Sequence, residues 1–294
     1  MGYIFILLTS IFNVTKGLCS KKASYKMDCL SDNINMNLLR NSMCVILGAL
    51  FILFIGNGEF SMPPMGLFIC TCSGAVMAFS YVVWVMSLKT DSYMFASAAN
   101  NAGFIIAALC GILFFGEKLT ICKAFAILFI IIALYFMTLY QTSFDKKPSA
   151  HDIFVLVLVF ASSGLNATVQ KWFTVALPGT AVHLYTFYTF IVSVILLSVY
   201  RLISRSPKTV SDEVATMKSV FPLVVIMSFS LYGATYFQAL AATMLDAVVL
   251  YPTSNAINLI GGSIMAWIMF GEKPNKYSII GTVLIFIALV MSRF

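Results

Sequence analysis

The chain is a succession of apolar stretches, each about 20 residues long, from its first residues to its last. A transmembrane helix needs roughly 20 mostly apolar residues to cross the hydrocarbon core of a bilayer. Only 10% of the 294 residues are charged, against about 25% in an average soluble domain. The sequence therefore predicts an all-α membrane protein in which almost nothing is left for a soluble domain.

Polar segments divide the apolar sequence into ten predicted spans. Their expected bounds are 2–18, 38–55, 65–88, 92–115, 119–140, 153–173, 180–200, 219–242, 247–270 and 277–292. The second span is the least regular, because Arg40 and Asn41 sit near its start. A polar stretch at 141–152 has five spans on either side. We therefore expect two five-helix repeats, residues 1–143 and 144–294.

A four-residue motif supports this division, because a repeat must reappear at a fixed offset. Phe115–Lys118 (Phe-Gly-Glu-Lys) returns as Phe270–Lys273, an offset of 155 residues. The same offset relates Tyr81 to Tyr236, Asp91 to Asp246, and Asn100 to Asn255. An offset of 153 residues aligns Ser10 with Ser163, Asn13 with Asn166, and Thr15 with Thr168. An odd number of spans per repeat makes the second half enter the membrane from the opposite side, so the repeats are expected to be inverted.

The basic residues of the expected loops are distributed unequally between the two sides of the membrane. One side receives Lys21, Lys22, Lys26, Arg40, Lys89, Lys146, Lys147, Arg201, Arg205, Lys208, Lys218, Lys273 and Lys276. The other side receives Lys118, Lys123 and Arg293. The positive-inside rule makes the crowded side cytoplasmic and places both termini outside. Topology thus explains the net charge of +7 without a nucleic-acid partner.

The repeated Phe-Gly-Glu-Lys turn, followed in the second half by Gly281 in an apolar helix, resembles the drug/metabolite transporter superfamily, particularly its EamA-type members. The resemblance covers essentially the whole chain. It implies a basket of ten helices around a central cavity lined by spans one, three, four, six, eight and nine. Small multidrug relatives carry a glutamate in the first span for proton-coupled cation export, whereas Asn13 and Asn166 stand in the first and sixth spans here. Proton-for-cation exchange of that kind is therefore not expected.

Polar side chains inside the spans are the candidates for a solute path, because an unsatisfied polar group in hydrocarbon is costly and usually faces the bundle interior. The candidate substrate-binding residues are Asn13, Tyr81, Asn100, Asn166, Tyr236, Gln238, Asn255 and Asn258. For Asn100 and Asn255 two interpretations stay open: contact with a ligand, or a hydrogen bond that joins the halves. The tyrosines can serve as stacking walls for a solute or as interfacial anchors.

Three further features have a structural and a functional interpretation. The Gly-Glu-Lys turns are expected to be tight connectors capped by glycine, not solute contacts. Lys16 and Lys171 can extend to the headgroups; if either pointed inward, the cavity would favour an anionic or zwitterionic solute. Pro252 can kink the ninth span and free backbone carbonyls.

The predicted function is secondary transport of a small organic solute, an amino acid or another metabolite, by alternating access. We expect no catalytic residues, because the histidines and nearly all acids fall at span edges or in loops. No Walker-type loop appears, and the seven cysteines lack metal-ligand spacing, so neither a cofactor nor a metal site is predicted. The expected partners are a small solute and the lipid bilayer of the cell membrane or of an organelle, with the chain as monomer or homodimer. A nucleotide-sugar exchanger and a non-transporting scaffold or signalling protein are the alternatives.

Overall fold

The computed structural model describes residues 1–27, 29–54, 56–87, 99–139, 150–179, 182–204, 208–270 and 276–291. Over these ranges the regular secondary structure is entirely helical, as the composition predicts. The helices are α1 (Gly2–Ser24), α2 (Leu30–Phe54), α3 (Pro64–Ser87), α5 (Phe104–Phe114), α6 (Ile121–Leu139), α7 (Ala150–Ala176), α8 (Val182–Ile203), α9 (Val210–Met244), α10 (Ala247–Phe270) and α11 (Lys276–Met291). The expected boundary between the repeats, at residues 143 and 144, lies outside the described residues.

Six of the helices in the described ranges are long and apolar enough to cross a membrane: α1, α2, α3, α7, α8 and α9. Two shorter apolar helical stretches, Ala99–Phe114 and Ile121–Ala133, fall in the fourth and fifth predicted spans. The described helix bounds agree with the predicted spans to within a few residues except at the first, second and eighth. There polar residues that were assigned to loops continue the helices, among them Lys21 and Lys22 at the end of α1.

The second span begins earlier than predicted, and this corrects the position of Arg40. Helix α2 starts at Leu30, with Asp32 in its first turn, where a carboxylate favours a helix N-terminus. Arg40 therefore lies about three turns inside the helix, roughly 15 Å from its start. Its placement among the cytoplasmic loop charges was wrong.

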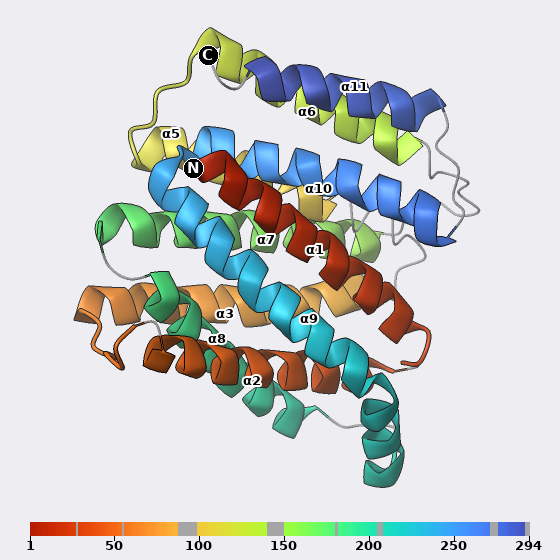
Figure 1. Ribbon diagram of the computed structural model, residues 1–294. Coiled ribbons are helices and arrows are strands. Elements are labelled where there is room, and N and C mark those ends of the chain that lie inside the picture. The colour runs from red at the N-terminus through yellow and green to blue at the C-terminus, as the bar shows by residue number, and fades with distance from the viewer. Residues whose placement is uncertain are drawn as a thin grey trace.

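Helix α9 is also longer than its predicted span. Its 35 residues extend over about 52 Å, whereas the hydrocarbon core is about 30 Å thick. Thr209 caps the helix by accepting a hydrogen bond from the backbone N–H of Asp212. The first turns bend away from the bundle (Figure 1). Pro222 lies inside the helix and removes one backbone hydrogen bond. This segment projects beyond the apolar part of the bundle.

Helices of the first half pack mainly on helices of the second half. α1 lies against α9 and α10, α2 against α8 and α9, and α3 against α7 and α8. α6 and α11 form a pair along one edge of the molecule (Figure 1). The two halves therefore share their buried surfaces.

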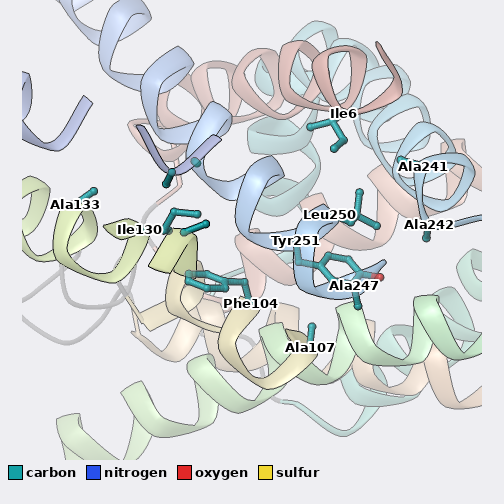
Figure 2. Close-up of a cluster of buried hydrophobic side chains, with 13 residues drawn as sticks. Ile6, Phe104, Ala107, Ile130, Ala133, Ala241, Ala242, Ala247, Leu250 and Tyr251 are labelled. Atoms are coloured by element: carbon teal, nitrogen blue, oxygen red, sulfur yellow. The ribbon is translucent and has the colours of Figure 1, made fainter. Parts of the chain in front are cut away.

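The main apolar core shows this sharing directly. Figure 2 shows Ile6 of α1, Phe104 of α5 and Ile130 of α6 around Leu250 and Tyr251 of α10. All five side chains are at most 2% exposed. The hydroxyl of Tyr251 leaves this core to donate a 2.6 Å hydrogen bond to the carbonyl of Ala167 in α7. Small side chains in this cluster, such as Ala107 and Ala247, let helices from both halves approach the Tyr251 ring closely.

Charged residues join three helices at the end of the bundle where α1 ends and α2 begins. Arg201 of α8 makes two hydrogen bonds of 2.7 and 2.8 Å to the carboxylate of Glu213 in α9. Asn35 of α2 bonds to both partners. Lys208 and Asp32 form a further ion pair at 2.7 Å. These contacts fix the ends of α2, α8 and α9 on the side predicted to be cytoplasmic.

Candidate functional site

Arg40 is a buried cation in the middle of α2. The residue is 6% exposed, and its Nε–H has no hydrogen-bond acceptor in the described chain. Its guanidinium carbon lies 4.8 Å from the centroid of the Tyr81 ring on α3, a distance typical of cation–π contact. The neighbouring Asn41 donates to Ser193 Oγ of α8 at 3.1 Å. The face of α2 that carries these two side chains is therefore polar and faces protein.

A second cation, Lys16 of α1, approaches the same place. Its Nζ donates to Asn13 Oδ1 at 2.9 Å, one helical turn earlier. Cys19, less than one turn further along α1, packs in one apolar cluster with Leu39 and Met43, which flank Arg40 on α2. The charges of Lys16 and Arg40 repel each other across this contact. Lys16 is therefore turned toward the helix bundle, which is the inward orientation considered above.

Aromatic side chains from both halves adjoin these cations. Tyr81 of the first half and Tyr236 of the second pack against one apolar cluster that includes Tyr232. The rings of Tyr232 and Tyr236 are nearly parallel, at 4° and 6.3 Å between centroids, and Phe51 of α2 lies 5.0 Å from Tyr236. The repeat-related tyrosines thus pack against the same cluster. We call Asn13, Lys16, Arg40, Tyr81, Tyr232 and Tyr236 the Arg40 cluster.

A second polar group surrounds a break in the fourth span. Residues 99–102 are helical, and a turn at Gly103 leads into α5. Turn-type hydrogen bonds join Gly103 to Asn100 and Ile106 to Gly103, at 3.3 and 3.0 Å. The carbonyl of Asn100 accepts from Ser163 Oγ of α7 at 2.7 Å. The carbonyl of Asn101 accepts from Asn255 Nδ2 of α10 at 3.0 Å.

The break lies in the fourth span. Helix α10, where a kink at Pro252 was considered, is assigned as one helix over Ala247–Phe270. The close approach of α5 and α7 explains the position, because a Cβ on Gly103 would lie 2.7 Å from Ser163 Cβ and 2.8 Å from the backbone nitrogen of Gly164. Side chains from the second half therefore replace the hydrogen bonds that the turn removes.

The candidate residues fall into these two groups and a remainder. Asn13, Tyr81 and Tyr236 belong to the Arg40 cluster, and Asn100 and Asn255 belong to the helix break. Asn258 lies one turn beyond Asn255, and its Oδ1 is buried without a partner among the described residues. Asn166 and Gln238 are half-buried on α7 and α9. Their part in a site stays a prediction.

The first Phe-Gly-Glu-Lys turn is a connector, as the sequence indicates, and its glutamate also clamps another helix. Gly116 has φ +66°, a left-handed conformation that glycine adopts without strain. Glu117 then accepts hydrogen bonds from the backbone N–H groups of Ala247 and Val248, at 2.7 and 3.0 Å. A carboxylate at the N-terminus of α10 accepts hydrogen bonds from two backbone N–H groups that have no partner within the helix, and it interacts favourably with the positive end of the helix dipole. The second copy of the motif lies mostly outside the described residues.

Lys171 completes this clamp. Its Nζ lies 3.5 Å from Glu117 Oε1, and both side chains are more than 90% buried. The same ammonium donates to the carbonyls of Ala242 and Leu245 at the end of α9. Glu117 and Lys171 therefore bind the turn between α9 and α10 from two sides. Lys171 does not extend to the headgroups.

A groove of about 460 Å³ lies elsewhere, between the start of α9 and α2. Asn35, Leu39, Glu213 and Phe221 are among its lining residues. It is wide open and its walls are mainly apolar. The chemistry that could bind a polar solute is concentrated instead at the Arg40 cluster, inside the bundle.

The sequence alone does not mark Arg40, Glu117 and Tyr232 as members of polar groups in the bundle. The available signal for Arg40 was Asp32, an acidic residue suited to a first helical turn two turns upstream of it. For Glu117 and Tyr232 no sequence signal was sufficient. Their roles depend on which helix of the other half lies opposite.

Comparisons with known proteins agree with this architecture. Residues 1–139 match the EamA-like transporter family. The sequence matches no curated protein. Among solved structures 28 chains match, and one of them, a crystal structure of a protein without a stated function, aligns with a TM-score of 0.77. That alignment covers 99% of this chain and 95% of the other at 12% identity, which shows a shared fold.

The family match and the apolar helices support the same conclusion. Six described helices can cross a membrane, and the matched residues run from α1 to the end of α6. The chain is a multi-pass membrane protein whose first half, residues 1–139, is similar to the EamA-like transporter family.

Proposed function

We propose that the chain is a secondary transporter that carries a small organic solute across the membrane by alternating access. The solute would bind between two inverted halves of the chain. The observation that carries the proposal is the Arg40 cluster, in which the ring of Tyr81 of the first half covers the buried Arg40. Tyr236 of the second half packs against the same apolar cluster as Tyr81. Polar and ionisable groups within membrane spans are costly and commonly mark a solute pathway. An amino acid or another metabolite of similar size is the proposed cargo, and the cell membrane is the proposed location.

The division of contacts supports alternating access. Broken helices that are satisfied by side chains of neighbouring helices are a known transporter device. Here the carbonyls of the fourth-span break bond to Ser163 and Asn255, both in the second half. A shift of one half against the other would exchange two hydrogen bonds at this point without unfolding a helix. Asn13, Asn166, Gln238 and Asn258 complete the proposed path.

The test is transport by purified protein in vesicles of neutral phosphatidylcholine. A thermal-shift screen against amino acids, nucleotide sugars, phosphorylated metabolites and cationic drugs first selects a ligand, because binding to the folded state raises its stability. Counterflow of the selected radiolabelled solute is then expected in protein-containing vesicles only. Tyr236→Ala is expected to reduce counterflow at least tenfold, an order of magnitude set by the loss of one aromatic wall.

A matched control separates this effect from general damage. Tyr135 on α6 is 61% exposed, and Tyr135→Ala should leave counterflow unchanged. Equal losses in the two variants would refute a special role for Tyr236. Failure of every solute class to stabilise the protein or to exchange would refute transport and favour the scaffold alternative.

A further inference from the structure

We propose that Arg40 and Lys16 bind the anionic group of the transported solute, a carboxylate or a phosphate. This inference rests on the proposed transport function and names the chemistry of its cargo. A guanidinium presents a rigid fork of donors that matches carboxylate and phosphate oxygens. An ammonium nearby supplies a second, more flexible charge.

Among the described residues, Arg40 and Lys16 lack the carboxylate partners that other cations of the bundle have. Lys171 pairs with Glu117, Arg201 with Glu213, and Lys208 with Asp32. In the described part of the chain, no carboxylate lies within ion-pair distance of Arg40 or Lys16, and the Nε–H of Arg40 has no acceptor. An unpaired buried charge is costly, and a neighbouring like charge adds repulsion. An anion at this place would relieve both costs.

Extension of Arg40 to lipid headgroups does not explain this arrangement. Such extension leaves the charged head exposed, whereas Arg40 is 6% exposed and is covered by the Tyr81 ring. The cation–π contact stabilises the guanidinium and leaves its Nε–H without an acceptor among the described residues. Arg40 therefore keeps this donor for a ligand while it is held in place by protein.

Arg40 also lacks a counterpart in the second half. At the offset of 155 residues that relates Tyr81 to Tyr236, Arg40 aligns with Ile195. At an offset of 153 it aligns with Ser193. A cation required by the packing of one five-helix half should recur in the other half. The single occurrence fits a ligand that binds in one orientation.

The aromatic rings near Arg40 indicate the chemistry of the part of the solute that is not charged. Tyr232 and Tyr236 are stacked and are continuous with Phe51. Aromatic faces favour planar or apolar bodies over fully hydrated ones. The probes that best fit this combination are phenylacetate and phenyl phosphate, with the isosteric neutral phenylacetamide as their control.

The first experiment measures probe binding by thermal shift in a neutral detergent, without anionic lipid. Both anions are expected to raise the melting temperature, and phenylacetamide is not. Arg40→Gln should weaken anion binding roughly tenfold to hundredfold, as expected for the loss of charge-assisted hydrogen bonds. Lys16→Gln should have a smaller effect in the same direction. Lys22→Gln, which removes an exposed charge from the same helix, should bind like wild type.

The stability of the free protein tests whether Arg40 is structural. Arg40→Gln removes an unpaired buried charge, so the ligand-free variant should be at least as stable as wild type. Clear destabilisation without ligand would overturn the proposal. Arg40→Lys keeps the charge and loses the fork, and it should bind the anions with intermediate affinity; binding as weak as that of Arg40→Gln would contradict a charge-based site.

Counterflow separates this inference from the transport function itself. Exchange of a neutral or cationic solute that is unaffected by Arg40→Gln would refute the anion site and leave transport intact. Stabilisation by phosphatidylglycerol, with no response to either soluble anion, would assign the site to a lipid headgroup and overturn the cargo proposal. Anion exchange that is lost in Arg40→Gln and retained in Lys22→Gln would support it.

Discussion

Replacement of Glu117 by glutamine should destabilise the protein far more than the loss of one surface charge. The carboxylate accepts two backbone hydrogen bonds at the start of α10 and faces Lys171 at 3.5 Å. Glutamine keeps the shape but offers one acceptor oxygen, and it leaves the ammonium of Lys171 without a negative partner. Breaking a buried pair in this way costs about 3–5 kcal/mol.

The free energy can be measured as a melting temperature of the purified protein in detergent. For chains of this size, 1 kcal/mol corresponds to roughly 2–4 °C, so Glu117→Gln should lower the melting temperature by about 6–20 °C. Lys171→Met removes the other charge and should have a comparable effect. In the double variant neither charge is left unpaired, so its loss should be clearly smaller than the sum of the two single losses.

The chain contains a matched control at the same helix end. Lys123 and Asp246 form an ion pair at 3.1 Å, in which Asp246 is 50% exposed. Exposed pairs contribute about 0–1 kcal/mol, so Lys123→Gln should shift the melting temperature by no more than a few degrees. Equal shifts for Glu117→Gln and Lys123→Gln, or strict additivity in the double variant, would refute a buried clamp.

Three further predictions concern the helix contacts. Asn255→Ala removes the bond to the broken fourth span and should cost about 1 kcal/mol by reversible unfolding in mixed micelles, together with a loss of counterflow; unchanged stability would contradict this role. Gly164→Ala places a methyl group 2.6 Å from the carbonyl oxygen of Gly103 and should cost about 1–3 kcal/mol in the same assay, whereas a neutral effect would mean that α5 and α7 can separate. Glu213→Gln leaves Arg201 with a weakened partner at the end of α8 and should accelerate proteolysis near residues 208–210; wild-type cleavage rates would show that this pair does not hold α9.

Most helix positions could be predicted because the hydrocarbon thickness sets a minimum apolar length. The prediction failed where polar residues continue a helix beyond that length, as in the first turns of α2 and α9. Helix initiation is governed there by Asp32 and Thr209, and hydropathy does not register their effect. Arg40 was consequently placed in a loop, although it lies inside the bundle.

The candidate site was predicted in part, because polarity and repetition identify residues but not their neighbours. The offset that relates Tyr81 to Tyr236 selected two side chains that pack against one apolar cluster. It could not show that Asn255 bonds to the carbonyl of Asn101, because the sequence did not predict a break at Gly103. Nor could it pair Glu117 with Lys171, which depends on the packing of α7 beside the turn that precedes α10.

The interleaving of the halves has a consequence for biosynthesis. When α1 to α6 have entered the membrane, Asn41 still lacks Ser193, Glu117 lacks both Lys171 and the start of α10, and the carbonyl of Asn100 lacks Ser163. The nascent first half thus carries polar groups in lipid whose partners have not been translated. Its helices must wait, loosely associated or shielded by the insertion machinery, until the second half arrives to complete their hydrogen bonds.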